Sequence, residues 1–216
     1  MNLKKYKSRI FTSSLLLFLL LLIYNYNPIL VYSLIILSLI SFLEFFNITK
    51  KIINNKFIYV LTNISFILYT FIFCLIFFYF ANNFHLKPLF YSLLLCCIGS
   101  DIGGFIFGKI FKGPKLTKIS PKKTYSGAIG SIIFSNIFFS CFIFTLLNKF
   151  FYVYFLVATI TSISCQLGDL CFSFLKRKAK IKDTGNFLPG HGGVLDRIDG
   201  ILLGVPLGLI SLILFF

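Results

Sequence analysis

Long apolar stretches alternate with short polar ones along most of this chain. A helix needs about 20 mostly apolar residues to cross a bilayer, and the pattern predicts seven such helices. Their expected ranges are residues 10–24, 28–46, 57–80, 88–111, 127–147, 151–175 and 194–216. The run Asn-Tyr-Asn-Pro at 25–28 also allows residues 10–46 to form a broken hairpin. We therefore expect an all-α, polytopic integral membrane bundle of about seven transmembrane helices.

Composition points to the same class of protein. Of the 216 residues, 58% are hydrophobic and only 12% are charged, whereas a soluble domain has about 25% charged residues. A core of this size cannot hide so much apolar surface, so lipid must solvate much of it. The length suits one continuous bundle, with N-terminal spans at 1–95 and a region at 96–216 that carries two basic loops.

The basic residues predict an orientation. The net charge is +15, from 21 Lys and Arg against 6 Asp and Glu. With the N-terminus in the cytoplasm, 19 of the basic residues fall on the cytoplasmic side, and only Lys87 and Lys149 on the other. Basic residues favour the cytoplasmic side and lie against anionic membrane lipids, so we expect the C-terminus outside. No basic stretch lies in a soluble domain, and nucleic acid is therefore not an expected partner.

Acidic residues are scarce, so their positions carry information. They are Glu44, Asp101, Asp169, Asp183, Asp196 and Asp199. A carboxylate within a span costs about 2.5–3.5 kcal/mol on insertion scales and is usually kept for a function. Glu44 ends a predicted span close to two lysines, and we interpret it as part of a surface ion pair.

Two of these acids open the last span on one helix face. Asp196 and Asp199 are three residues apart, a spacing that places side chains together on a helix. Oxygen ligands without a His or Cys cluster suit a hard ion such as Mg²⁺. Structural ion pairs with Lys176, Arg177 or Arg197 explain the same spacing equally well.

A glycine-rich segment, GSDIGGFIFGK, occupies residues 99–109. Its glycines, at 99, 103, 104 and 108, allow neighbouring helices to approach closely, and they match neither a dinucleotide loop nor a Walker loop. We expect them to serve helix packing. Asp101, within this segment, either faces a polar cavity or hydrogen-bonds a neighbouring helix.

Two polar stretches are expected on the cytoplasmic side. In the first, KLTKISPKKTYSGAIG, a Ser120-Pro121 turn precedes Lys122, Lys123 and Thr124 at the start of a span. Such a cluster fits a phosphate site and fits equally a basic flank that touches lipid phosphates. The second, SFLKRKAKIKDTGNFLPGHGGVLDRIDG, places His191 in a turn-rich run, where it either contacts a phosphate or only hydrogen-bonds the turn.

This second stretch resembles the signature of the phosphatidate cytidylyltransferase family. The matching positions are Ser173, Lys176-Arg177, Lys182-Asp183, Gly185, Leu188-Pro189, His191-Gly192-Gly193, Asp196-Arg197 and Asp199. The segments ISPKKT (119–124) and QLGDL (166–170) also resemble family segments and follow the expected order. The resemblance covers roughly residues 97–205.

The resemblance implies transfer of CMP from CTP to phosphatidate, at a Mg²⁺-dependent site on the cytoplasmic side of a bacterial inner membrane. It leaves open a second cation and a homodimer. The implied catalytic residues are Asp169, Asp196, Asp199, Lys176, Arg177 and His191, and the three aspartates are also the implied metal ligands. The implied substrate-binding residues are Ser120, Lys122, Lys123, Thr124, Lys182, Asp183 and Arg197.

Two positions depart from the family pattern. Family members usually carry an acid at the position of Ser126 and a glutamate at the position of Phe172, so two carboxylates near the expected site are absent. One alternative function is a CTP-dependent lipid-alcohol kinase, which would release CDP. The others are a degenerate, non-catalytic protein and a transporter, although the sequence lacks the inverted repeat typical of transporters.

Overall fold

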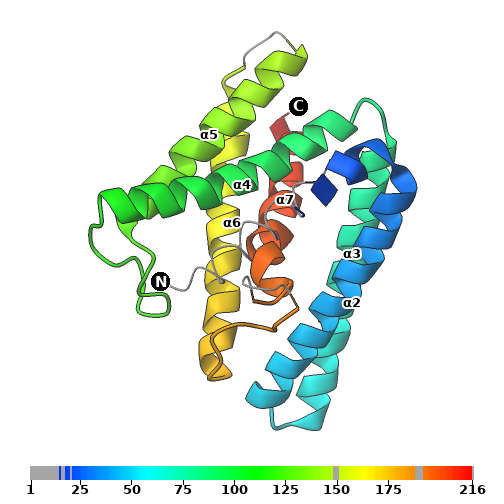
Figure 1. Ribbon diagram of the computed structural model, residues 1–216, viewed down its shortest axis with the longest axis vertical. Helices are drawn as coiled ribbons and strands as arrows, with labels where there is room; N and C mark the ends of the chain where they lie inside the picture. Colours follow the sequence, from blue (N-terminus) through cyan, green and yellow to red (C-terminus); the bar gives the residue numbers. More distant parts are fainter. Residues whose placement is uncertain (1–14, 16–17, 20, 148–150, 188–191, 216) are drawn as a thin grey trace. The chain divides into compact units, whose positions relative to one another are not determined.

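The computed structural model describes residues 15, 18–19, 21–147, 151–187 and 192–215 (Figure 1). It contains six long helices: α2 (Asn27–Ile52), α3 (Lys56–Asn82), α4 (Lys87–Ile110), α5 (Tyr125–Leu147), α6 (Val153–Lys178) and α7 (Leu195–Phe215). Each of them contains a stretch that is long and apolar enough to cross a membrane. The described residues form no strand, and an isolated bridge joins Lys115 to Thr124. The predicted all-α membrane bundle is confirmed.

The first predicted span, residues 10–24, lies mostly outside the described residues. The described part of it, residues 15, 18–19 and 21–24, is helical, and this helix continues to residue 25. The chain then breaks at Tyr26, whose backbone is extended (φ −126°, ψ 104°). Pro28 lies in the first turn of α2, where its missing N–H would have no helical partner in any case. The break that the sequence allows at residues 25–28 is therefore present.

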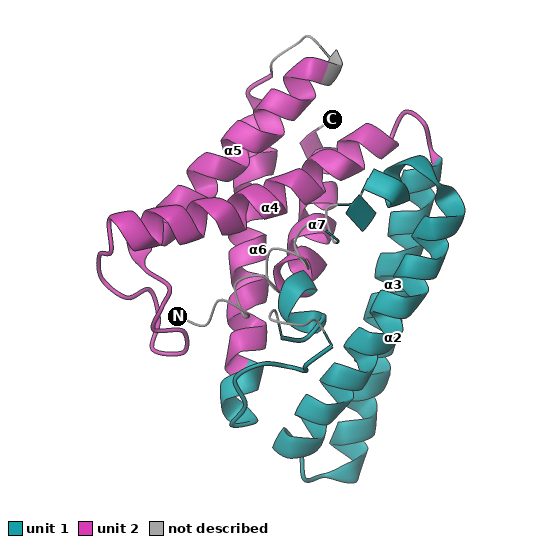
Figure 2. Ribbon diagram, in the orientation of Figure 1, with its two compact units in different colours: residues 1–82, 175–198 teal, residues 83–174, 199–216 magenta. Residues whose placement is uncertain are grey.

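The chain forms two compact units (Figure 2). Unit 1 consists of residues 1–82 and 175–198, and unit 2 of residues 83–174 and 199–216. The last turn of α6 and the first turn of α7 belong to unit 1, and the remainder of both helices belongs to unit 2. The division expected from the sequence, at residue 95, stays a prediction.

In unit 1, α2 and α3 lie side by side and are joined by residues 53–55 (Figure 1). The rings of Phe45 and Phe66 stack with their centroids 3.9 Å apart. The Thr49 hydroxyl donates a hydrogen bond to Asn63 Oδ1 at 3.1 Å. Aromatic stacking and a buried polar tie together hold the two helices in register.

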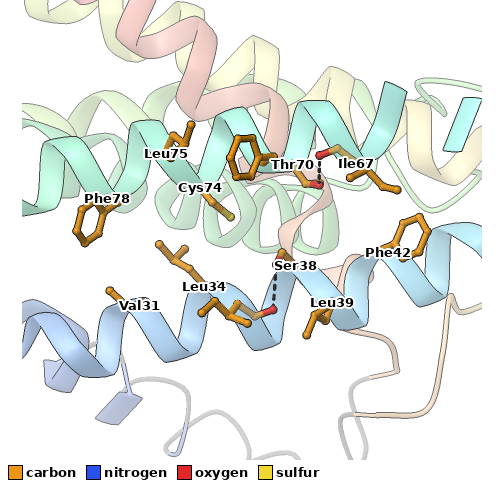
Figure 3. A pocket seen from close by; sticks show the side chains of 12 residues that line it. Val31, Leu34, Ser38, Leu39, Phe42, Ile67, Thr70, Cys74, Leu75 and Phe78 are labelled. Atoms are coloured by element: carbon orange, nitrogen blue, oxygen red, sulfur yellow. Dashed lines mark hydrogen bonds between the residues drawn. The ribbon is translucent and has the colours of Figure 1, made fainter. Parts of the chain in front are cut away.

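A cavity of about 600 Å³ lies between the same two helices (Figure 3). No charged residue lines it, and its two hydroxyl groups belong to Ser38 and Thr70. Both hydroxyls donate to carbonyl oxygens of their own helices, at 2.9 and 3.0 Å. The cavity therefore suits hydrocarbon and offers nothing to a phosphate.

In unit 2, α4 and α5 pack backbone to backbone through glycines. A Cβ atom at Gly103 would collide with the carbonyl oxygen of Gly130 and lie 2.7 Å from Phe134 Cβ. A Cβ atom at Gly127 would lie 2.9 Å from the carbonyl oxygen of Gly104. Such close approach is possible only without side chains, so the packing role expected for the glycines of residues 99–109 is confirmed at the α4–α5 contact.

Helix α6 joins this pair through hydroxyl groups and contacts α7 through further glycines. The Ser131 hydroxyl donates to the carbonyl oxygen of Ser100 at 2.7 Å, and the Ser100 and Ser162 hydroxyls lie 3.0 Å apart. A Cβ atom at Gly168 would lie 2.6 Å from the backbone carbonyl oxygen of Asp199. This contact brings the QLGDL segment of α6 against the part of α7 that begins at Asp199.

Replacing Gly103 with alanine tests the glycine packing. Because the colliding atom belongs to the backbone of α5, the helices must separate, and overpacking of this kind costs about 1–3 kcal/mol. We expect Gly103→Ala to lower the melting temperature of the detergent-solubilised protein. Ile102→Ala, a change at the exposed neighbour on α4, is the control. Equal melting temperatures for the two variants would contradict the packing role.

Candidate active site

A polar cavity of about 290 Å³ opens in unit 2. Three segments that are distant in the sequence form its wall: α4, the loop before α5 with the first turns of α5, and α6. The lining residues are Ser100, Asp101, Gly104, Phe105, Leu116, Ser120, Lys122, Lys123, Thr124, Gly127, Ala128, Ser131, Gln166 and Asp169. Four residues of the predicted substrate site and one predicted catalytic aspartate therefore share one cavity.

The loop before α5 folds back on itself and so presents its lysines to the cavity. Leu116 donates its backbone N–H to the carbonyl oxygen of Lys123 at 2.8 Å, and Lys123 donates to that of Ser120 at 3.0 Å. The second bond closes a turn at Ser120-Pro121, as the sequence predicts. Lys122 and Lys123 consequently follow the turn and line the cavity.

Thr124 caps the N-terminus of α5. Its Oγ1 accepts a hydrogen bond from the backbone N–H of Gly127 at 3.1 Å, the usual role of a threonine at this position. The Ser126 hydroxyl donates to the carbonyl oxygen of Lys112 at 3.1 Å and so fixes the start of the loop, where Lys112 has φ +53°. The first turn of α5, which carries a partial positive charge, thus borders the cavity beside the two lysines.

Two carboxylates balance these cations. Lys123 Nζ lies 3.0 Å from Asp169 Oδ2, and the two side chains are 28% and 26% exposed. Asp101, on α4, lines the same cavity, one of the two positions that the sequence allows for it. A pair that is partly open to solvent can exchange partners, so Lys123 can turn from Asp169 to an incoming phosphate.

The oxygen donors of this cavity suit a hard cation. Asp101 and Asp169 supply carboxylates, and Ser120 and Thr124 supply hydroxyls. Mg²⁺ is commonly held by one or two carboxylates together with substrate phosphates. The described residues contain no group of three or more His, Cys, Asp or Glu side chains arranged around one ion. The donor set therefore fits Mg²⁺ that binds together with a phosphate ligand.

A second polar centre lies in unit 1, around Asp196. Its Oδ1 accepts a hydrogen bond from Lys176 Nζ at 2.6 Å, with the two side chains only 12% and 8% exposed. Its Oδ2 accepts bonds from the backbone N–H of Thr184 at 2.8 Å, from the Thr184 hydroxyl at 3.1 Å and from Gly193 N at 3.2 Å. Of the two explanations that the sequence allows for Asp196, the structure contains the ion pair.

The end of α6 fixes the position of Lys176. Ile181 donates its N–H to the carbonyl oxygen of Lys176, and Lys180 donates to that of Arg177, both at 3.0 Å. Lys180 adopts φ +56°. These features form a Schellman motif, which stops the helix directly after its basic residues, where positive charge is favourable.

The remaining predicted residues differ in how far they are exposed. Arg177, Lys182, Asp183 and Arg197 are exposed. Asp199 is buried, and its Oδ1 accepts a hydrogen bond from Gly200 N at 3.0 Å. His191 lies outside the described residues, and its predicted role stays a prediction. The structure therefore gathers Ser120, Lys122, Lys123, Thr124 and Asp169 in unit 2 and pairs Lys176 with Asp196 in unit 1.

Comparison with known proteins identifies the family. The model of the cytidylyltransferase family matches residues 1–215. The chain belongs to the cytidylyltransferase family. The resemblance drawn from the signature positions at 173–199 is therefore confirmed.

Curated relatives of this cytidylyltransferase-family chain carry the name phosphatidate cytidylyltransferase. The protein from Helicobacter pylori is 39% identical over 123 residues, which are 57% of this chain and 46% of the relative. That from Rickettsia felis is 45% identical over 123 residues (53% and 54%), and that from Mycobacterium leprae 38% identical over 113 residues (52% and 36%). The chain spans about half the length, or less, of these relatives.

The surface ion pair predicted for Glu44 is wrong. This side chain is buried, 2% exposed, and accepts hydrogen bonds from the Thr184 hydroxyl and from the backbone N–H groups of Val194 and Leu195, at 2.7, 3.0 and 2.8 Å. The error began with the end of the helix, because α2 continues to Ile52, six residues beyond the predicted span. Glu44 thus lies two turns inside the helix. A carboxylate within a span is costly, and this cost was the signal in the sequence that could have identified Glu44 as a buried, hydrogen-bonded residue.

The two lysine–aspartate pairs should respond differently to loss of the cation. Exposed pairs contribute about 0–1 kcal/mol, whereas removal of one partner from a buried pair costs about 3–5 kcal/mol. We expect Lys176→Met to lower the free energy of unfolding much more than Lys123→Met, as measured by denaturant titration in detergent. Lys182→Met, at an exposed lysine, is the control. A larger loss for Lys123→Met would contradict the burial seen here.

Proposed function

We propose that this member of the cytidylyltransferase family transfers CMP from CTP to phosphatidate, giving CDP-diacylglycerol and pyrophosphate. The observation that carries the proposal is the unit 2 cavity, where Lys122, Lys123 and the start of α5 offer positive charge beside Asp101 and Asp169. Lysines at a helix N-terminus form a favourable phosphate site. The name of the curated relatives supports the same reaction.

The reaction needs charge compensation more than it needs a strong base. A phosphatidate oxygen attacks the α-phosphorus of CTP, and the bond from this phosphorus to the β-phosphate breaks. Pyrophosphate leaves with the electron pair of that bond. A phosphate monoester is already anionic at neutral pH, so the main barrier is the repulsion between two anions. Fixed positive groups reduce this repulsion and stabilise the departing charge.

The residues of the cavity have distinct roles in this proposal. Lys122 and Lys123 bind the phosphates of CTP, and the Ser120 and Thr124 hydroxyls donate hydrogen bonds to them. Asp169 holds Lys123 in place until a phosphate arrives. Asp101 and Asp169, the two carboxylates of the cavity, would hold Mg²⁺, which would supply Lewis-acid stabilisation of the phosphates. Metal roles for Asp196 and Asp199 and a second cation stay predictions.

The same charge pattern supports an orientation. The loop that contains Lys122 and Lys123 and the end of α6 with Lys176 to Lys178 are rich in basic residues, which favour the cytoplasmic side. CTP is a cytoplasmic solute, so a cytoplasmic cavity can receive it directly. We infer a bacterial inner membrane, with the C-terminus on the opposite side. A homodimer stays a prediction.

The direct test supplies the purified protein in detergent with phosphatidate, radiolabelled CTP and Mg²⁺, with and without EDTA. We expect label in the lipid fraction, released pyrophosphate in equal amount, and loss of both with EDTA. Release of CDP with a lipid alcohol as acceptor would favour the kinase instead. No labelled lipid, while an active relative assayed in parallel produces it, would overturn the proposal.

The role of Lys123 has a matched control in the same loop. Lys118 is exposed and does not line the cavity, so Lys118→Gln removes the same charge without touching the site. We expect Lys123→Gln to raise the KM for CTP by about tenfold, since a charge-assisted hydrogen bond contributes about 1.5–3 kcal/mol, and Lys118→Gln to change it little. Equal KM values for both variants would show that Lys123 does not bind CTP.

A further inference from the structure

Glu44 lies on α2, outside the part of the chain that resembles the family signature, yet it contacts that signature directly. Its Oε1 accepts a hydrogen bond from Val194 N, and its Oε2 accepts bonds from Leu195 N and the Thr184 hydroxyl. Val194 and Leu195 form the start of α7. A carboxylate at a helix start satisfies N–H groups that have no partner inside the helix. Glu44 thus caps α7 from a different helix.

The signature loop is shaped around this carboxylate. A Cβ atom at Gly185 would collide with Glu44 Oε1 and lie 3.0 Å from Glu44 Cδ. A Cβ atom at Gly193 would lie 2.5 and 2.7 Å from the two carboxylate oxygens. Neither glycine has a left-handed backbone. Glu44 restricts the space at Gly185, and at Gly193 the Thr184 hydroxyl is nearer still than the Glu44 carboxylate. Glu44 and the threonine that it bonds together explain why neither position has room for a side chain.

Thr184 connects Glu44 to Asp196. Its hydroxyl lies 2.7 Å from Glu44 Oε2 and 3.1 Å from Asp196 Oδ2, and its backbone N–H donates to the same Asp196 oxygen at 2.8 Å. Gly193 N, adjacent to the capped residues, is a further donor to Asp196 Oδ2. Besides Lys176, the donors to Asp196 are thus Thr184, which Glu44 bonds, and Gly193, which precedes the residues that Glu44 caps. The single proton of the Thr184 hydroxyl serves one of the two carboxylates at a time.

We propose that Glu44 is a positioning residue for the transferase reaction. It fixes Thr184 and residues 193–195, and through them it sets the orientation of Asp196 and of Lys176, which Asp196 holds. This inference rests on the proposed function. Glu44 is not among the residues that we assign to CTP, so we expect its loss to lower turnover and to leave CTP binding intact.

Glutamine at position 44 isolates the acceptor function from packing. Glu44→Gln keeps the shape of the side chain but offers one acceptor atom in place of two, and its NH₂ group then faces a backbone N–H that cannot turn away. The orientation of residues 193–195 should relax as a consequence. Thr184→Val removes the connecting hydroxyl with little change in volume, and Thr184→Ser keeps it.

The experiment compares wild-type protein with Glu44→Gln, Thr184→Val, Thr184→Ser and the Glu44→Gln/Thr184→Val double variant, each purified in detergent. Ser41→Ala is the matched control, because Ser41 is buried on the same helix and bonds only the carbonyl oxygen of Leu37 in its own helix. Two quantities are measured: the kinetic constants for CMP transfer from CTP to phosphatidate, and backbone hydrogen exchange by mass spectrometry.

For Glu44→Gln we expect kcat to fall by between about tenfold and about a hundredfold, as for other displaced catalytic groups, and the KM for CTP to change by less than about threefold. Exchange should accelerate in peptides that cover residues 192–198 and stay unchanged in α4 and α5. Thr184→Val should lower kcat in the same way, Thr184→Ser should recover it, and the double variant should lose less than the product of the single losses. Ser41→Ala should match wild type.

Wild-type kcat in Glu44→Gln overturns the inference. Faster exchange throughout α4 to α7, with kcat and KM altered together, also overturns it, because Glu44 would then contribute to stability alone. Wild-type protein without transferase activity overturns the proposed function and with it the catalytic role of Glu44. In that case the exchange in residues 192–198 still decides whether Glu44 holds the start of α7.

Discussion

A carboxylate on an apolar helix can persist only where the protein supplies its hydrogen-bond donors, because lipid supplies none. Three described acids follow that constraint. Asp196 accepts hydrogen bonds from Lys176 and from the backbone N–H groups of Thr184 and Gly193, Glu44 from those of Val194 and Leu195, and Asp169 from Lys123. The Thr184 hydroxyl lies within hydrogen-bond distance of both Glu44 and Asp196 and donates its one proton to either of them. The polar centres of the two units are therefore a requirement for the stability of the helices that carry these acids. The bundle must deliver lysines, hydroxyls and helix N-termini to these acids in order to exist in a membrane.

Glycine serves this requirement in two different ways. At Gly103 and Gly130, the absence of a side chain lets two helix backbones approach closely, next to Gly104 and Gly127, which line the unit 2 cavity. At Gly185 and Gly193, the same absence leaves room for the Glu44 carboxylate. The first role is visible as small residues on one helix face. The second depends on a group from another helix and has no local pattern.

The excess of basic over acidic residues acquires a chemical meaning in the unit 2 cavity. In the reaction that we propose, two anions must meet, and a site with lysines and few carboxylates reduces the cost of bringing them together. The Asp169 carboxylate beside Lys123 partly neutralises the positive charge of the cavity. Ser126, which stands where the family usually has an acid, instead ties the loop to Lys112, so this position serves loop geometry here.

The sequence by itself determined the helical class, six of the spans and the family, because apolar runs and fixed motif spacings are local properties of the chain. It also predicted four residues that line the unit 2 cavity and lie within one short segment, namely Ser120, Lys122, Lys123 and Thr124. Only the tertiary structure decided the partners of the acids. Glu44 meets Leu195 across 151 residues, and Lys123 meets Asp169 across 46. Hydropathy indicates how much free energy a charged residue costs within a span. Which donor offsets that cost depends on how the helices pack, and no local sequence pattern encodes this packing.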